Sequence, residues 1–193
     1  MTTDARRLAI ALGISLVAVG TGGCGYNTMQ TMDEQVNSAE SQIKVQLQRR
    51  ADLIPNLVET VRGFARQEST IFVAVAEARG RLAGAVQGGN LEEMAQANAA
   101  LTAPLGRLLA IAEAYPQLRS NENFRALQDQ LEGTENRIAV ARQDYNETVN
   151  RYNAYIRRFP QAITAKVIGM KSRPYFDLTN ADAADVPAVD FSR

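Results

Sequence analysis

The sequence predicts an all-α protein: a long antiparallel bundle of three main helices, followed by a short C-terminal helix and an extended tail. The composition is rich in Ala, Gln, Glu and Arg and holds only 6% aromatic residues, which favours helices. Two long segments place apolar residues at alternating spacings of three and four, so each presents one apolar stripe to a helical partner. A chain of 193 residues is expected to form one domain with a sizeable core.

The N-terminus has the pattern of an export signal. Arg6 and Arg7 precede the uncharged, largely apolar run Leu8–Gly20, which is followed by small residues. The run is shorter than the roughly 20 residues that span a bilayer. We therefore expect residues 1–23 to be a signal peptide, with the helical domain outside the cytoplasm, on the periplasmic side of a bacterial cell envelope.

Cys24 directly follows those small residues and resembles a bacterial lipoprotein processing site. In this interpretation Cys24 carries a diacylglycerol thioether, its new amino terminus receives a fatty acid such as palmitate, and residues 24–30 form a lipidated linker to the membrane. Thr21 stands where such sites usually have Leu. Two alternatives therefore stay open, an uncleaved membrane anchor and an unlipidated, buried cysteine.

The first main helix is expected from Thr31 to Val86. Eleven of its fourteen stripe positions are apolar. Pro55 removes one helical N–H and crowds the carbonyl four residues earlier, at a cost of roughly 3 kcal/mol. Because the stripe keeps its phase across Pro55, we expect a kink at Ala51–Leu53, with the freed carbonyls bonded by Arg or Asn side chains. The stripe positions are Val36, Glu40, Ile43, Leu47, Arg50, Ile54, Leu57, Val61, Phe64, Glu68, Ile71, Val75, Ala78 and Leu82.

The second helix is expected at 91–114, with Asn90 as its N-cap and a bend or split before Pro104. The third is expected from a cap at Asn121 to Pro160. Its stripe is Phe124, Leu127, Leu131, Thr134, Ile138, Ala141, Tyr145, Thr148, Tyr152, Tyr155 and Phe159.

The predicted bundle spans residues 31–176, with a short helix near 161–170 and an extended tail at 177–193. The third helix either folds back to complete a three-helix layer or continues beyond the second helix along the same side of the first.

Several polar residues fall within these helices, and Asn in particular is a poor helix former. We interpret them as an interhelical hydrogen-bond network that fixes register. A ligand cleft and plain solvated faces are the alternatives. The members of the predicted network are Arg50, Asn56, Glu135, Arg142, Asn146 and Asn153.

The end of the third helix combines aromatic and basic residues. We interpret the aromatic ladder Tyr145, Tyr152, Tyr155 and Phe159 as core. The basic residues fit anionic lipid headgroups or an acidic partner, or equally complement the helix dipole. These basic residues are Arg151, Arg157, Arg158, Lys166, Lys171 and Arg173.

The composition excludes several kinds of activity. The chain has no His and one Cys, so it cannot build a His-based triad, a His-ligated metal site or a Cys–His nucleophile. It has 21 basic and 21 acidic residues, so it lacks the basic field of a nucleic-acid-binding protein. We expect neither a metal nor a cofactor.

Separated motifs resemble the LemA family of bacterial envelope proteins. They are QLQRRADLIPNLVETVRGFARQE at Gln46–Glu68, the dipeptide Tyr26-Asn27, the segment Glu113–Pro160 and the tripeptide Val189–Phe191. The resemblance implies a helical fold without an established biochemical activity. It also implies an association with membrane organisation and with envelope proteases or their regulators.

Together these observations favour a non-catalytic, membrane-anchored helical scaffold that contacts envelope proteins and forms homo-oligomers. One alternative is a cell-wall hydrolase that uses carboxylates alone. The carboxylates of the first stripe, Glu40 and Glu68, are 28 residues apart, which is too far for one bond on a continuous helix. Another alternative is a carrier that holds an apolar ligand between its helices.

Overall fold

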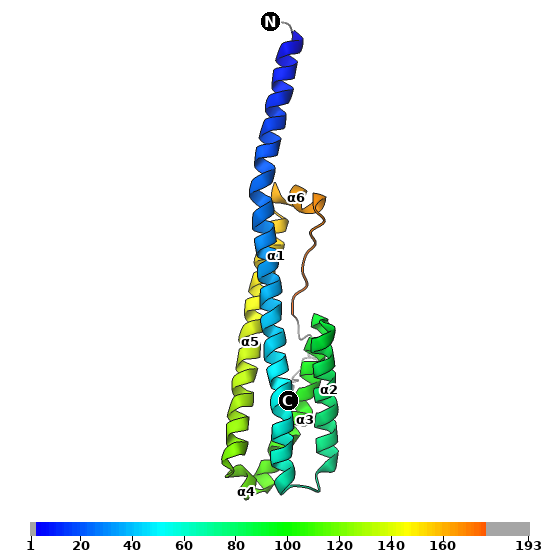
Figure 1. Ribbon diagram of the computed structural model, residues 1–193, viewed down its shortest axis with the longest axis vertical. Helices are drawn as coiled ribbons and strands as arrows, with labels where there is room; N and C mark the ends of the chain where they lie inside the picture. Colours follow the sequence, from blue (N-terminus) through cyan, green and yellow to red (C-terminus); the bar gives the residue numbers. More distant parts are fainter. Residues whose placement is uncertain (1–2, 177–193) are drawn as a thin grey trace, which may run out of the picture. The chain divides into compact units, whose positions relative to one another are not determined.

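The computed structural model describes the backbone of residues 3–176 and the side chains of residues 25–176. The predicted tail 177–193 lies outside the described residues, as do the side chains of the predicted signal peptide and of Cys24. Every regular element that the structure describes is a helix, which confirms the all-α class. The helices are α1 (Thr3–Phe64), α2 (Ser69–Gly88), α3 (Leu91–Ala114), α4 (Pro116–Arg119), α5 (Glu122–Ile156) and α6 (Gln161–Val167) (Figure 1).

The chain divides into two compact units, and α1 and α5 contribute to both. One unit comprises Met1–Gln42 and Ala141–Tyr175, and the other comprises Ile43–Val140 and Phe176–Arg193. We refer to them as the α6 unit and the α2–α3 unit.

The α2–α3 unit packs the end of α1 with α2, α3, α4 and the start of α5. α2 turns back along the end of α1, and α3 then returns beside α2 (Figure 1). Apolar residues of each helix face its interior and are fully buried, as the alternating spacing predicts. Examples are Leu47, Leu57 and Val61 of α1, Val75 and Leu82 of α2, and Leu101 and Leu108 of α3.

The prediction of one helix from Thr31 to Val86 is wrong, because the chain reverses at residues 65–68. Ala65 closes α1 by donating its N–H to the Val61 carbonyl (3.0 Å), and the Glu68 carbonyl accepts from Ile71 at the start of α2 (3.1 Å). Polar residues from Arg66 onward occupy the turn, and the side chains of Arg66 and Gln67 are exposed. The apolar stripe continues on both sides because α1 and α2 bury the same period against a shared core.

Pro55 is accommodated within α1 without a break. Its ring leaves the carbonyl of Ala51 without the usual intrahelical N–H. Arg79 of α2 supplies the missing donor, since its Nε lies 3.2 Å from the Ala51 oxygen. This confirms the prediction that an Arg or Asn side chain bonds a carbonyl freed by Pro55.

Helix starts follow the predicted caps. The side chain of Asn90 accepts hydrogen bonds from the N–H groups of Glu92 (2.9 Å) and Glu93 (3.3 Å) at the start of α3. The side chain of Asn121 likewise accepts from the N–H of Phe124 (3.0 Å) in α5. α3 continues through Pro104 as one helix. Of the two predicted alternatives at this proline, a bend or a split, the split is therefore wrong.

The α6 unit combines the first part of α1 with the end of α5, α6 and the segment after it. Tyr145 and Tyr152 are buried, as predicted for the aromatic ladder, and Tyr155 is half-buried. Phe159 is 84% exposed, so the prediction that it belongs to the core is wrong. The reason is that α5 ends at Ile156, so Phe159 lies in a turn outside the periodic face of that helix.

Candidate functional site

A buried charge lies at the centre of the α2–α3 unit. Arg50 of α1 is 3% exposed, and its Nη1 donates to Oδ1 of Asn98 in α3 (2.7 Å). Its Nη2 lies 4.0 Å from the carboxylate of Glu135 in α5, a residue that is 63% exposed. Burial lowers the pKa of Arg50, and the charge of Glu135 partly offsets this. One guanidinium therefore links three helices.

Asn98 was not among the predicted network residues, although the sequence carries a signal for it. It occupies a polar position within the apolar stripe of α3, between Met94 and Leu101, and all three side chains are buried. A polar residue at a stripe position needs a buried partner. The only buried cation in the described part of the chain supplies that partner.

The six predicted network residues are divided between the two units. Arg50 and Glu135 meet, as described above. Asn56 is exposed on α1, and its backbone carbonyl accepts from the Thr60 hydroxyl (2.9 Å), so its assignment to a buried network is wrong. Two helical positions beyond Ile54, it points away from the buried stripe.

The remaining three predicted residues, Arg142, Asn146 and Asn153, belong to the α6 unit. Arg142 and Asn146 are half-buried and have interaction partners. Asn153 is buried, and its side chain binds the segment that follows α6. Buried polar contacts therefore occur as separate groups within each unit.

The contacts of Asn153 hold the chain after α6 against α5. Its amide nitrogen donates to the backbone carbonyl of Arg173 (2.9 Å), and its amide oxygen accepts from the backbone N–H of the same residue (2.9 Å). The guanidinium of Arg173 makes two hydrogen bonds to the carboxylate of Asp33 in α1 (3.0 and 3.1 Å) and a third to the side chain of Asn37 (3.0 Å). We call this group of four residues the tail latch.

Two buried tyrosines extend the tail latch along α5. The hydroxyl of Tyr145 donates to the Pro174 carbonyl (2.9 Å), and that of Tyr152 donates to the Lys171 carbonyl (3.1 Å). Burial raises the pKa of Tyr145 to about 12, with a further contribution from Glu40. Both phenols are therefore neutral donors that fix backbone, and neither is poised as a base near neutral pH.

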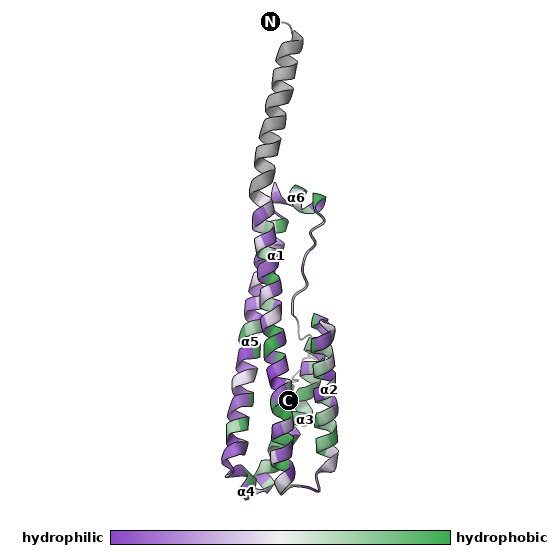
Figure 2. Cartoon of the chain, in the orientation of Figure 1, coloured by the Kyte–Doolittle hydropathy of each residue, from purple (hydrophilic) through white to green (hydrophobic). Residues whose placement is uncertain are grey.

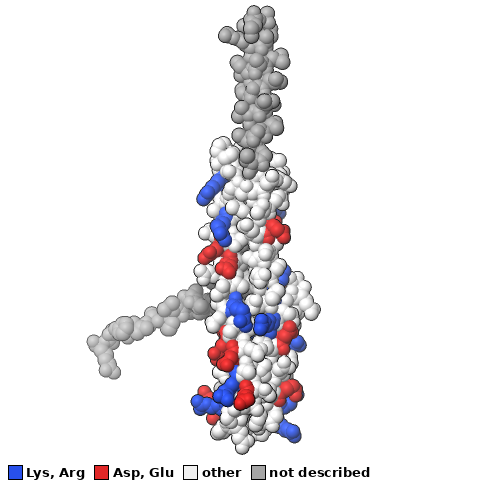
Figure 3. Space-filling model, turned by 60° about the vertical axis from the view of Figure 1, so that its left-hand side comes forward, with Lys and Arg blue, Asp and Glu red and all other residues white. Residues whose placement is uncertain are grey.

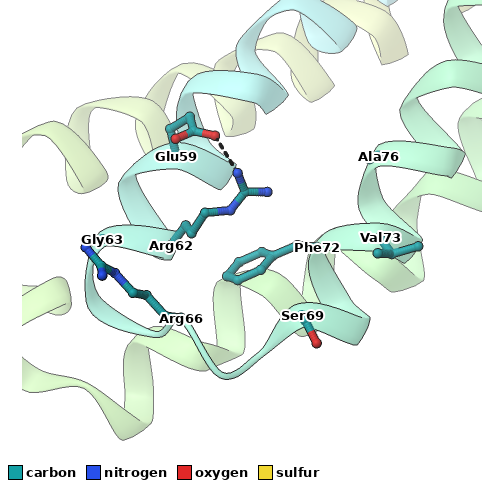
Figure 4. Close-up of a pocket in the computed structure, with 8 residues that line it drawn as sticks. All are labelled: Glu59, Arg62, Gly63, Arg66, Ser69, Phe72, Val73 and Ala76. Atoms are coloured by element: carbon teal, nitrogen blue, oxygen red, sulfur yellow. Dashed lines mark hydrogen bonds and ion pairs between the residues drawn. The ribbon is translucent and has the colours of Figure 1, made fainter.

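The turn between α1 and α2 borders an open hollow of about 580 Å³ (Figure 4). Arg62 lies over the ring of Phe72, 5.3 Å from its centroid, and donates to the carboxylate of Glu59 (2.9 Å). Glu59 is the one carboxylate among the lining residues. The hollow therefore lacks the second carboxylate that acid–base glycoside chemistry requires.

The described residues contain no group of three or more His, Cys, Asp or Glu side chains placed to hold a metal ion. Among the same residues, no helix combines the length and apolar character that crossing a bilayer would require. Glu40 and Glu68, the carboxylates considered for a hydrolase, belong to different units.

Comparison with known proteins identifies the family. The sequence profile of the LemA family matches residues 39–191. Magnetosome proteins MamQ 1 and MamQ 2 of Paramagnetospirillum magneticum are each 30% identical to this chain over 189 residues, covering 85% of it and 68% of each relative. Magnetosome protein MamQ of Magnetospirillum gryphiswaldense is 30% identical over 206 residues, covering 94% of this chain and 75% of the relative. These matches confirm the resemblance seen in the motifs, and the chain belongs to the LemA family.

Proposed function

We propose that this protein is a non-catalytic, membrane-anchored scaffold of the bacterial cell envelope. The observation that carries the proposal is the use of its buried polar side chains. Arg50 binds Asn98, Arg79 binds the backbone of Ala51, and Asn153 binds the backbone of Arg173. These buried polar side chains hold helices and chain segments together, as expected of a rigid protein that acts through contacts on its surface.

The comparisons support a role of this kind without naming a partner. The relatives are described as magnetosome proteins. The anchor in this proposal is the N-terminal segment with lipid on Cys24, and the helical domain lies on the periplasmic side. Its partners are envelope proteins or further copies of the same chain.

Site-specific photo-crosslinking in intact envelopes tests the scaffold. A crosslinker at Val140, an apolar residue of α5 that is 58% exposed, is expected to capture a small set of discrete envelope proteins or a second copy of this chain. A crosslinker at Glu132, an exposed charged residue of the same helix, serves as the control. Identical crosslinks from both positions, or none from Val140 or a second exposed apolar position such as Val45, would contradict the proposal.

An enzymatic role is tested with the purified protein and isolated peptidoglycan. We expect no release of soluble fragments. Release that one Glu→Gln substitution abolishes would contradict the proposal and favour the carboxylate-dependent hydrolase.

The lipid anchor is tested separately through Cys24→Ser. We expect the variant to accumulate as a soluble or unprocessed product, because acyl chains contribute roughly 0.8 kcal/mol per buried CH₂ to membrane binding. Fractionation and gel mobility measure this directly. Unchanged partitioning and mobility would rule out the lipid and favour an uncleaved anchor.

A further inference from the structure

The α6 helix and the turn before it expose a group of apolar side chains. Phe159 is 84% exposed, Val167 is 80% exposed and Ile163 is 58% exposed. Ile163 and Val167 are four residues apart, so they lie on one face of α6, while Ala165 faces inward and is buried. The hydropathy colouring shows apolar residues within α6 (Figure 2). Neighbouring exposed apolar residues mark an interaction site more often than single ones do.

Basic residues flank this apolar group in the sequence, and no acidic residue lies among them. Residues 148–176 contain six Lys or Arg residues and no Asp or Glu. The tail latch uses one of them, Arg173, to bind Asp33. The other five, which are all exposed, are Arg151, Arg157, Arg158, Lys166 and Lys171. Among the described residues, the uppermost charged side chains in the view of Figure 3 are basic.

Among the described residues, the acidic side chains of α1 in this unit are Asp33, Glu34 and Glu40, which come later in the helix than Gly25, where α6 begins against α1. The first acidic residue of α1 whose side chain is described is Asp33, and it is occupied by Arg173. Residues 25–32 of α1 are uncharged. The five exposed cations therefore lie close in sequence to the exposed apolar side chains of α6, with no acidic residue between 148 and 176 to offset their charge.

The position of α6 relates this surface to the proposed anchor. A Cβ atom added to Gly25 would lie 3.5 Å from Cγ of Gln161, the first residue of α6, and 4.0 Å from the hydroxyl of Tyr155. The first residue of α6 therefore lies against α1 at Gly25, the residue that follows Cys24. The tail latch holds the segment on the other side of α6 through Arg173.

We propose that the exposed face of α6 docks onto an anionic lipid surface. Phe159, Ile163 and Val167 enter the interface between headgroups and acyl chains, and the surrounding Lys and Arg side chains contact the anionic headgroups. This inference depends on the proposed membrane anchoring, which brings α6 to the bilayer. It adds a second contact, selective for lipid charge, that fixes the orientation of the α6 unit on the membrane.

The absence of Trp from this chain makes a clean test possible. The full chain carrying Val167→Trp or Phe159→Trp holds a single indole at the docking face. It is reconstituted into phosphatidylcholine vesicles with or without phosphatidylglycerol, each containing a brominated phosphatidylcholine that quenches indole fluorescence on contact. Val140→Trp, at an apolar position 58% exposed on α5, is the matched control.

The expected result is a blue shift and bromine quenching at positions 159 and 167 that increase with phosphatidylglycerol, without such an increase at position 140. The substitutions Arg157→Glu and Lys166→Glu are each added singly to the Val167→Trp chain. Each is expected to lower the ratio of docked to undocked α6 by at least about fivefold, because that is the binding free energy that one cation contributes near an anionic surface. Raised salt is expected to act in the same direction.

Several results would overturn the docking. Equal quenching at positions 140 and 167, or no dependence on phosphatidylglycerol, would remove the selective contact. A blue shift that rises with protein concentration and is independent of lipid would assign the face to a second copy of the chain. Sedimentation with vesicles separates the two proposals: variants that sediment without quenching refute the docking alone, and variants that fail to sediment refute the anchoring as well.

Discussion

The contact between Arg50 and Asn98 allows a quantitative test of what holds the α2–α3 unit together. Replacing Asn98 with Leu, which has a similar shape, removes the 2.7 Å hydrogen bond and leaves the guanidinium with only the carboxylate of Glu135 at 4.0 Å. Leaving a buried charge without its close partner costs about 3 kcal/mol. Replacing Arg50 with Met instead leaves a buried amide unsatisfied, at a cost of about 1–3 kcal/mol.

The double variant Arg50→Met with Asn98→Leu removes both polar groups together. Buried polar partners exchanged jointly for apolar residues leave stability nearly unchanged or improved. We therefore expect the double variant to lose at least about 2 kcal/mol less than the sum of the two single losses. Glu135→Gln is the control. Because the Glu135 side chain is largely exposed and lies 4.0 Å from Arg50, its removal should cost less than about 0.5 kcal/mol.

Guanidinium chloride unfolding, followed by circular dichroism at the helical band, measures the free energies of unfolding of the unmodified chain and of the four variants. Losses for the two single variants that add to within about 0.5 kcal/mol of the double variant would refute the coupling. A larger loss for Glu135→Gln than for Asn98→Leu would also refute it, because the carboxylate would then be the principal partner of the guanidinium.

Three further predictions concern other contacts of the same kind. Burial raises the pKa of Tyr145 from its usual 10.0 to about 12, so the contribution of the protonated phenol to stability is complete below pH 10 and is lost as the pH rises toward 12. Relative to the Tyr145→Phe variant, the unmodified chain should lose about 1.3 kcal/mol of unfolding free energy between about pH 9 and 11. Unfolding free energies of the two chains that stay parallel across this pH range would contradict the prediction. Arg79→Met leaves the Ala51 carbonyl without its donor and should cost about 1–3 kcal/mol, measured by denaturant unfolding against the exposed-residue control Arg81→Met. Asp33→Asn removes the charge opposite Arg173 and should cost about 1 kcal/mol, with faster amide exchange in the segment after α6; unchanged exchange there would contradict the tail latch.

The sequence alone is sufficient for the all-α class, for the caps of α3 and α5 and for most of the buried helix faces, because those features depend on local spacing. Asn90 and Asn121 lie where the caps were expected, and the stripe residues that bury most deeply, such as Leu47 and Leu82, follow the alternating pattern. The reversal at Ala65 could not be predicted in the same way. A stripe reports which side of a helix is buried, and a helix that folds back onto the same core keeps that side buried without changing the period.

The candidate site shows the same limit. The predicted network includes both Arg50 and Glu135, but the close partner of Arg50 is Asn98, a residue of α3 outside that network. Partners on different helices depend on how far each helix slides along the next, which single-helix periodicity does not specify. Phe159 was assigned to the core because its spacing fits α5, but the helix ends three residues earlier.

The hydrogen bond from Arg79 to Ala51 makes the continuity of α1 at Pro55 dependent on α2. A helix that contains a proline lacks one intrahelical hydrogen bond, and here a side chain of α2 donates the replacement. When α2 withdraws, the carbonyl is released to water and α1 gains a hinge at that level. Bending of α1 and undocking of α2 are therefore thermodynamically coupled, so anything that binds to and restrains α2 also stiffens α1.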